Sequence, residues 1–207
     1  MSDHYFSADP AAPFAREPFT CEVWGQRLDL VSGSGVYSRG HLDIGTSVLF
    51  RETEPPGPGH VLDLGTGYGV IGLAVAAAWR AAGVPAGPDS GVTGIEVNQR
   101  AVLLAEQNAA ALGLDDRYVA CGPDAVPDTE TFDEIWSNPP IRIGKESLHD
   151  LLLRWFPRLR PGGRAVMVVG KNLGADSLQA WLTDQGWPTT RLASAKGFRV
   201  LESRLSP

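Results

Sequence analysis

The sequence predicts an α/β fold in which helices cover both faces of a mostly parallel sheet. From His60 onward, apolar runs of strand length alternate with helical segments, and this alternation is typical of a parallel sheet. The first two strands lead into helices through a glycine turn and through Asn98, respectively, and both suit a helix start. The tail differs, because two strands flank Lys196-Gly197 closely enough to form a closing antiparallel hairpin.

The core elements follow in order from His60. The strand H-V-L-D-L ends in G-T-G-Y-G, and the helix after it covers 70–82 and ends at Gly83. A second strand at 92–97 leads to a helix that Asn98 caps and Gly113 ends. Further strands are expected at 117–121, 133–136 and 165–169, and further helices at 146–159 and 176–185.

The length of the chain favours one domain. With 207 residues, 43% of them apolar, it is long enough for one substantial core and short for two. Within a single domain at 1–207 we expect an N-terminal part at 1–50 and the α/β core at 51–207. Residues 1–19 contain several prolines and little periodicity, which is typical of an extended arm.

Short elements are expected between the arm and the core. The segments 19–24 and 27–31 alternate around Gly25-Gln26, which indicates a β-hairpin. A glycine-rich loop at 33–40 follows, and Asp43 or Thr46 then begins a short helix.

Composition argues against several classes of protein. Cys21 and Cys121 stand apart, without the clustering that a disulfide framework or a structural metal needs, so no metal site is expected. The N-terminus lacks a basic region followed by an apolar one, and the apolar run Val70 to Trp79 is too short to span a bilayer. We therefore expect a soluble cytoplasmic protein.

The charge of the chain is unevenly distributed. The net charge is −6, but residues 1–138 carry 7 Lys and Arg against 19 Asp and Glu, whereas residues 139–207 carry 11 against 5. This asymmetry is either incidental or the mark of a locally positive face for a polyanion on an acidic body.

The glycine turn resembles two kinds of cofactor site. Gly67, Gly69 and Gly72 match G-x-G-x-x-G, the dinucleotide fingerprint, which by itself is a weak signal. Asp63 and Gly65 extend it to D-x-G-x-G-x-G, with a carboxylate expected to point into the crevice. A carboxylate repels a pyrophosphate and attracts an ammonium. The turn therefore favours S-adenosylmethionine, whose methionine end carries an amino group, a carboxylate and a sulfonium.

Two further acids are candidates for the adenosine part. Glu96 ends the second strand, where an acid accepts both ribose hydroxyls, although an NAD site places an acid there too. Asp124 follows the third strand and is expected near the adenine amino group. The structural alternative for these acids is a solvated position beside a tight strand-to-helix turn.

The stretch S-N-P-P-I follows the fourth strand at the same edge of the sheet. Pro139 has a carbonyl but no N–H, and Pro140 restricts Pro139 to an extended conformation. The side-chain oxygen of Asn138 and the Pro139 carbonyl can each accept one hydrogen of a planar NH2 group. Gripping both hydrogens turns the nitrogen lone pair toward an electrophile, so this motif predicts N-methylation by positioning and electrostatics, without a strong base. An ordinary turn with an Asn cap is the alternative.

The ordered motifs resemble a known family. V-L-D-L-G-T-G-Y-G, I-E-V-N, S-N-P-P-I and K-G-F-R-V, preceded by G-V-Y-S-R-G-H-L-D-I-G-T, resemble the methyltransferase small domain family of class I S-adenosylmethionine-dependent methyltransferases. Among its members, the chain is similar to the 16S ribosomal RNA guanine-N2 methyltransferases, whose larger members carry an additional N-terminal domain. The resemblance implies a Rossmann-like sheet of seven mostly parallel strands with a C-terminal antiparallel hairpin and an N-terminal β-hairpin extension.

The resemblance and the motifs together assign candidate site residues. The cofactor-binding candidates are Tyr37, Ser38, Gly45, Asp63, Gly65, Thr66, Gly67, Tyr68, Gly69, Glu96, Val97, Asp124 and Asn138. The catalytic candidates are Asn138, Pro139 and Pro140, and the substrate-binding candidates are Ile141, Arg142 and Lys145. Many amine methyltransferases have an aromatic residue where Ile141 stands, so base stacking is expected from elsewhere. Arg142 and Lys145 are candidates for phosphate contacts or simply solvated charges.

The expected function is N-methylation of an exocyclic base amine, with guanine N2 of small-subunit ribosomal RNA as the substrate and RNA as the partner. Methylation of a protein glutamine amide or of adenine N6 remains an alternative, because the same motif grips either group. An NAD-dependent oxidoreductase and a non-catalytic cofactor-binding module are the other classes considered. The oligomeric state and the role of the loop at 85–91 stay open.

Overall fold

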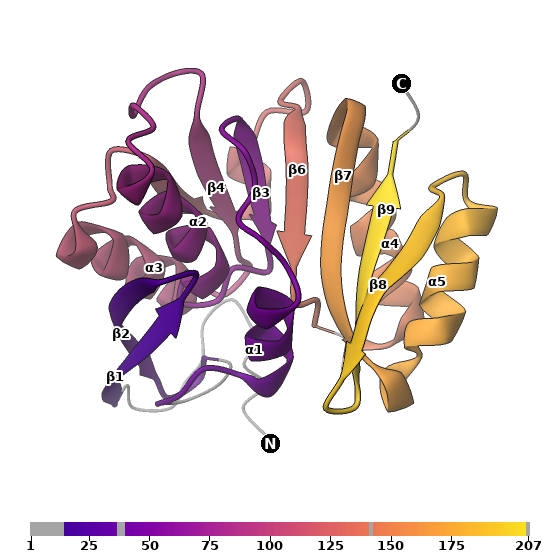
Figure 1. Ribbon diagram of the computed structural model, residues 1–207, viewed down its shortest axis with the longest axis horizontal. Helices are drawn as coiled ribbons and strands as arrows, with labels where there is room; N and C mark the ends of the chain where they lie inside the picture. Colours follow the sequence, from indigo (N-terminus) through magenta and orange to yellow (C-terminus); the bar gives the residue numbers. More distant parts are fainter. Residues whose placement is uncertain (1–14, 37–39, 141–142, 206–207) are drawn as a thin grey trace.

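The computed structural model describes residues 15–36, 40–140 and 143–205 (Figure 1). The strands are β1 (Arg16–Val23), β2 (Gln26–Gly33), β3 (His60–Leu64), β4 (Gly91–Ile95), β5 (Tyr118–Cys121), β6 (Phe132–Ser137), β7 (Leu159–Gly170), β8 (Thr189–Ala195) and β9 (Phe198–Arg204). The α-helices are α1 (Ile44–Arg51), α2 (Val70–Ala81), α3 (Gln99–Leu112), α4 (Lys145–Trp155) and α5 (Ala175–Asp184). None of the helices in the described ranges is long and apolar enough to cross a membrane.

The central sheet has seven strands in the order β5-β4-β3-β6-β7-β9-β8. The strands from β5 to β7 pair in parallel, and β9 runs antiparallel to both of its neighbours. A separate two-stranded sheet is formed by β1 and β2. The predicted parallel α/β sheet with a C-terminal antiparallel hairpin and an N-terminal hairpin is therefore confirmed.

Alternate residues of the strands enter two cores on opposite faces of the sheet. Trp136 and Val166 pack in one core with α2, α3, α1 and the β1–β2 hairpin. Ile135 and Met167, each one position away, pack in the other core with α4 and α5. Both faces are buried at Ile135 and Trp136 of β6 and at 165–169 of β7, so these parts of the two strands are continuously apolar.

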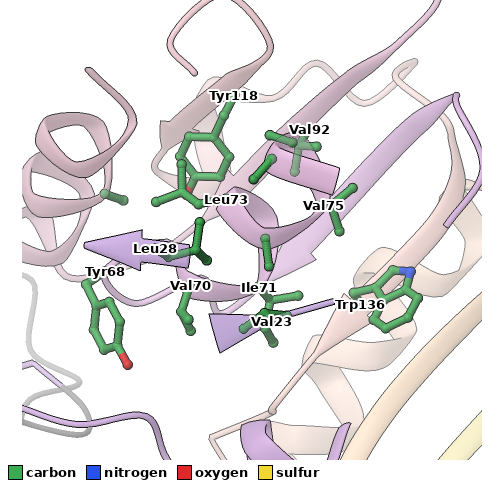
Figure 2. Packing of buried hydrophobic residues seen from close by; sticks show 14 of the residues in the cluster. Val23, Leu28, Tyr68, Val70, Ile71, Leu73, Val75, Val92, Tyr118 and Trp136 are labelled. Carbon is green, nitrogen blue, oxygen red and sulfur yellow. The ribbon is translucent and has the colours of Figure 1, made fainter. Parts of the chain in front are cut away.

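The first core is centred on α2, whose small residues let it lie close to the sheet. Figure 2 shows Leu73, Val92 and Tyr118 close together at one end of this cluster and Trp136 at the other. A Cβ atom on Gly72 would collide with the Tyr118 ring and Val92. The glycine repeat therefore serves helix packing as well as the loop before the helix.

Several predicted boundaries move by a few residues. The turn between β1 and β2 is at Trp24-Gly25, both with positive φ, and not at Gly25-Gln26, because that turn type needs two left-handed residues in succession. The predicted helix at 146–159 ends at Trp155, and a 3-10 turn (Phe156–Arg158) leads directly into β7. Phe156 keeps helical angles and donates its N–H to the Leu152 carbonyl, but Pro157 has no N–H to continue the helical hydrogen bonds, which accounts for the early end.

Candidate active site

A cavity of about 360 Å³ opens along the carboxyl edge of the parallel strands. In Figure 1 this is the lower edge, where β6 ends near α1 and where the β8–β9 turn also lies. Its wall combines residues from both halves of the sheet: Val36, Asp43, Thr46, Leu64, Gly65, Thr66, Gly67, Tyr68, Val70, Ile71, Ile95, Glu96, Val97, Asn98, Ala101, Pro123, Asn138, Pro139, Pro140, Leu151, Arg154, Trp155, Gly170, Leu173 and Phe198.

The strand order divides the cavity into two parts. Glu96 and Gly65 follow β4 and β3, whereas Asn138 follows β6, and Gly170 and Phe198 lie on β7 and β9. The cavity thus has a β3–β4 half, which contains the glycine loop, and a β6–β9 half beyond Asn138.

The glycine loop forms one wall of the β3–β4 half. Gly65, Gly67 and Gly69 all have positive φ, between 57° and 95°, a region that residues with a Cβ atom rarely occupy. Gly67 donates its backbone N–H to one Glu96 oxygen at 3.1 Å, and Asn98 donates its own to the other at 3.0 Å. Both Glu96 oxygens are therefore held in place at the cavity wall, and burial raises the pKa of this carboxyl.

Asp63 lies beneath the loop and not in the crevice. Its side chain is fully buried, and one oxygen accepts from the Thr66 hydroxyl at 2.5 Å and from the Gly72 N–H at 2.8 Å. The Thr66 hydroxyl also lies 2.8 Å from the Tyr118 hydroxyl. The structure therefore corrects the expectation that Asp63 points at a ligand ammonium, because its hydrogen bonds hold the loop to the start of α2.

Burial raises the pKa of Asp63 to about 6 from 3.8, against the opposing effect of the hydrogen bonds from Thr66 and Gly72. The other Asp63 oxygen is buried and has no hydrogen-bond partner within the described ranges. The folded state therefore favours the protonated acid. The protonated Asp63 therefore contributes to the free energy of unfolding. This contribution is fully present below pH 3.8 and is lost as the pH rises through about 6.

We expect the Asp63→Asn variant to lack this pH dependence, because an amide does not titrate. The free energy of unfolding, measured with urea from pH 4 to pH 7, should fall in the wild type relative to the variant by up to about 3 kcal/mol. The other titrating groups are common to both proteins and cancel. A difference between the two that stays constant over this pH range would contradict the assignment.

The far end of the β3–β4 half differs from the prediction for Asp124. The Asp124 side chain is 93% exposed and accepts from Arg154 at 3.0 Å, whereas its neighbour Pro123 lines the cavity. Arg154 also donates to the Pro123 carbonyl and itself lines the cavity. Asp124 thus lies outside the cavity and forms an ion pair with Arg154. Pro123, Val97 and Arg154 line the cavity where Asp124 was expected.

Asn138 stands where the two halves meet. Its Nδ2 atom donates to Asp43 Oδ2 at 2.8 Å and to Thr46 Oγ1 at 2.9 Å. Pro139 and Pro140 line the cavity beside it, and Pro140 lies over Gly65. Both hydrogens of the amide nitrogen are therefore bonded at the start of α1. The amide oxygen remains as the atom that can accept a hydrogen bond from a molecule in the cavity.

Gly45 lies under the cavity wall and not in it. A Cβ atom at this position would lie 2.9 Å from Asp43 Oδ2 and 2.9 Å from the Phe198 ring. The predicted cofactor contact of Gly45 is therefore replaced by a packing role between the Asp43 carboxylate and Phe198.

Of the fourteen predicted site residues that the structure describes, nine line one cavity. Gly65, Thr66, Gly67, Tyr68, Glu96, Val97, Asn138, Pro139 and Pro140 line it, Gly69 caps α2 immediately behind the loop, and Asp63, Gly45 and Asp124 lie outside the wall. Tyr37, Ser38, Ile141 and Arg142 fall outside the described residues. Lys145 is exposed at the start of α4.

Sequence reasoning missed the wall of the β6–β9 half and the contacts of α1. Phe198 and Leu173 line this half, and Leu173 is 55% exposed. Asp43 and Thr46 were recognised only as possible helix starts. The spacing D-x-x-T is a capping pattern, and nothing in it indicates that the same side chains contact Asn138.

The basic C-terminal third is largely neutralised by ion pairs. Each of the following arginines lies within 4.0 Å of a carboxylate: Arg154, Arg158, Arg160, Arg164, Arg191, Arg199 and Arg204. In the part of the chain that the structure describes, Lys145, Lys171 and Lys196 form no ion pair. Lys171 directly follows the wall residue Gly170 and Lys196 lies two positions before the wall residue Phe198, so both lysines belong to segments that border the β6–β9 half.

The parallel sheet, the glycine loop, the acid after β4 and Asn-Pro-Pro at one cavity together define a class I methyltransferase. The sequence matches the methyltransferase small domain family over residues 27–202. The chain therefore belongs to this family, whose methyl donor is S-adenosylmethionine.

Comparisons with individual proteins agree with the family. The chain is 34% identical over 203 residues to the ribosomal RNA small subunit methyltransferase C of Pseudomonas entomophila, and the match covers 96% of the chain and 57% of that protein. It is 29% identical to "Uncharacterized protein YbxB" of Bacillus subtilis, over 99% of both chains. A solved structure of the T. thermophilus 16S rRNA N2 G1207 methyltransferase (RsmC), in complex with AdoMet and guanosine, has a TM-score of 0.76 at 25% identity. That match covers 95% of the chain and 52% of the solved one, so the chain spans about half the length of these two methyltransferases.

Proposed function

We propose that the protein transfers a methyl group from S-adenosylmethionine to an exocyclic amine of an RNA base, with guanine N2 of small-subunit ribosomal RNA as the substrate. The observation that carries this proposal is the Asn138 amide, whose nitrogen is held by Asp43 and Thr46 at the junction of the two cavity halves. A ribosomal substrate implies a cytoplasmic location.

The β3–β4 half suits S-adenosylmethionine. A Cβ atom on Gly67 would meet no other atom within 4 Å and one on Gly65 would meet only Pro140 at 3.7 Å, so this wall leaves open space that side chains would fill. Glu96 offers two fixed acceptor oxygens for a ribose, and Val97 and Pro123 offer an apolar wall for a purine. When bound here, the cofactor supplies an electrophilic methyl group. The open space at the glycine loop, the Glu96 oxygens and the apolar wall thus suit the methionine part, the ribose and the adenine of the cofactor, respectively.

The β6–β9 half suits a flat acceptor amine. The Asn138 Oδ1 atom and the Pro139 carbonyl accept its two hydrogens, which concentrates the nitrogen lone pair toward the β3–β4 half. The acceptor nitrogen loses one proton after it gains its fourth bond, and water at the open side of the cavity takes that proton. No side chain of the site is required as a strong base.

Phe198 and Leu173 are candidates for the base stacking that was expected from residues other than Ile141. They present apolar surface in the β6–β9 half, where an aromatic residue after Asn-Pro-Pro stacks on the target ring in many amine methyltransferases. A planar base needs an apolar face of this kind, and a glutamine side chain does not. This wall favours a nucleobase over the protein amide.

The named relatives favour guanine among the bases. The Pseudomonas protein is named a small-subunit ribosomal RNA methyltransferase, and the T. thermophilus protein is named an N2 G1207 methyltransferase and was solved with guanosine. Adenine N6 and the glutamine amide remain the competing acceptors, because Asn-Pro-Pro grips any planar amine.

The direct test is transfer of tritiated methyl groups from labelled S-adenosylmethionine to ribosomal RNA, to small ribosomal subunits and to total protein in parallel. We expect label in RNA, and nuclease digestion should release it as N2-methylguanosine. Label in protein would overturn the proposal in favour of the glutamine amide. Release as N6-methyladenosine would overturn the choice of base.

The lysines at the cavity rim give a second test of an RNA substrate. We expect Lys171→Glu and Lys196→Glu each to raise KM for RNA several-fold at low salt and to reduce the salt dependence of binding, because each removes one phosphate contact. Cofactor affinity, measured by calorimetry, should not change. Arg27→Glu, on the distant β2 strand, makes the same change of charge and should leave KM unaltered. Equal effects of the three reversals would argue against an RNA contact at this rim.

A further inference from the structure

We propose that Asp43 and Thr46 are positioning residues that fix the amide of Asn138, so that its oxygen and not its NH2 group meets the acceptor amine. This inference rests on the proposed N-methylation, and it assigns a role in the reaction to the first turn of α1. Neither side chain is expected to touch the transferred methyl group.

The need for positioning follows from the shape of an asparagine side chain. The oxygen and the NH2 group of an amide are nearly equal in size, so half a turn about the last side-chain bond exchanges them at little steric cost. An oxygen accepts a hydrogen from an acceptor amine, whereas an NH2 group would oppose it with hydrogens of its own. The site works only in one of these two orientations.

Asp43 decides the orientation by its charge. An ionised carboxylate only accepts hydrogen bonds, so the Asn138 atom that lies 2.8 Å from Asp43 Oδ2 is the nitrogen. Thr46 Oγ1 accepts the second Nδ2 hydrogen at 2.9 Å. In the reversed amide the hydrogen bond to Asp43 would be lost and the amide oxygen would lie against a carboxylate, and the Thr46 hydroxyl would have to turn and donate instead of accepting.

The start of α1 holds the two partners in place. Asp43 is the N-cap of α1, and its Oδ2 atom also accepts from the Thr46 backbone N–H at 3.1 Å. Thr46 is 3% exposed, so its hydroxyl has little freedom to turn away. A Cβ atom on Gly45 would lie 2.9 Å from the same Asp43 oxygen, so the space around this oxygen is closed. One carboxylate oxygen thus joins the helix start to the catalytic asparagine.

The hydroxyl of Thr46 can be removed with little other change. Thr46→Val keeps the size and branching of the side chain and leaves the backbone N–H that Asp43 caps. We expect kcat to fall roughly tenfold, by loss of one of the two bonds that orient the amide. The dissociation constant of S-adenosylmethionine should change less than about threefold, and Thr46→Ser should restore most of kcat. Thr53→Val, which removes a hydroxyl that bonds the Leu49 carbonyl at the other end of α1, is the matched control and should leave kcat unchanged.

Gly45→Ala tests the carboxylate from the opposite direction. Alanine is the better helix former, so local propensity predicts a variant at least as stable as the wild type. The added Cβ atom must displace the Asp43 carboxylate or the Phe198 ring. We therefore expect a folded protein with lowered kcat, and unaltered kcat would show that the closed space around Asp43 is irrelevant to the reaction.

A readout without any substrate separates this inference from the proposed function. The side-chain NH2 resonances of Asn138, assigned by their loss in Asn138→Ala, report the two hydrogen bonds directly in nitrogen-15 spectra. We expect them to shift and exchange faster with water in Thr46→Val and to return toward their wild-type positions in Thr46→Ser. Unchanged resonances in Thr46→Val would overturn the positioning role even if RNA is methylated. Shifted resonances in an enzyme that methylates no RNA would instead overturn only the proposed substrate.

Discussion

Replacing Asn138 by alanine is expected to lower kcat by about 10² to 10³-fold, which corresponds to about 3 kcal/mol of transition-state stabilisation. The amide oxygen is one of two acceptors that hold the hydrogens of the acceptor amine, and its hydrogen bond strengthens as the nitrogen becomes positively charged. The effect should therefore fall on kcat more than on the KM of the cofactor. Single-turnover transfer of labelled methyl groups measures it.

The variant must still fold and bind cofactor for this result to be informative. Among the described residues the Asn138 side chain is bonded to Asp43 and Thr46 at the start of α1, so we expect a modest loss of stability and a near-normal cofactor dissociation constant. Unchanged turnover in a folded Asn138→Ala protein would exclude the mechanism. Loss of cofactor binding would instead show that the Asn138 side chain contributes to the cofactor site.

Replacing Glu96 by alanine is expected to weaken S-adenosylmethionine binding by about 10 to 100-fold. The side chain supplies both acceptor oxygens for the ribose, and its removal also leaves the Gly67 and Asn98 N–H groups without their partner. Isothermal calorimetry measures the affinity. Glu96→Gln keeps the size of the side chain and one acceptor oxygen. Its affinity for S-adenosylmethionine should lie between those of the wild type and Glu96→Ala.

The same calorimetry separates the two cofactors that an acid after β4 can serve. The wild-type protein should bind S-adenosylmethionine and should not bind NAD at comparable concentrations, because the cavity that the glycine loop lines also reaches Asn138 and the two prolines after it, which suit an acceptor amine. NAD binding that is lost in Glu96→Ala would contradict the assignment of the β3–β4 half. It would favour an oxidoreductase.

Local signals predicted the elements of the core well. Asn98 caps α3 through its side chain, and Gly113 ends that helix with φ of 63°, as the sequence predicts. The strand at β3 and the helix α2 also fall within a residue or two of their predicted bounds. These features depend on residues within one turn or one strand of each other, so the sequence alone is enough to predict them.

Predictions about side-chain direction were less successful. Asp63 was expected in the crevice, but the alternation of β3 and the hydrogen bonds from Thr66 and Gly72 turn it beneath the loop. The C-terminal basic residues left open either an incidental asymmetry or a positive face, and the structure shows that partners 23 to 38 positions away neutralise arginines such as Arg158, Arg164 and Arg199. Burial and pairing of this kind depend on how separate elements pack.

The sequence by itself determined that this protein has a parallel α/β sheet, a glycine loop after the first core strand and an Asn-Pro-Pro turn at the same edge. Only the tertiary structure decided which residues share the cavity with that turn. Asp43 reaches Asn138 across 95 positions, and Phe198 reaches the cavity wall on the antiparallel strand β9. The physical reason is that periodicity and capping act over a few residues, whereas the contacts that orient the amide arise from packing α1 against the assembled sheet.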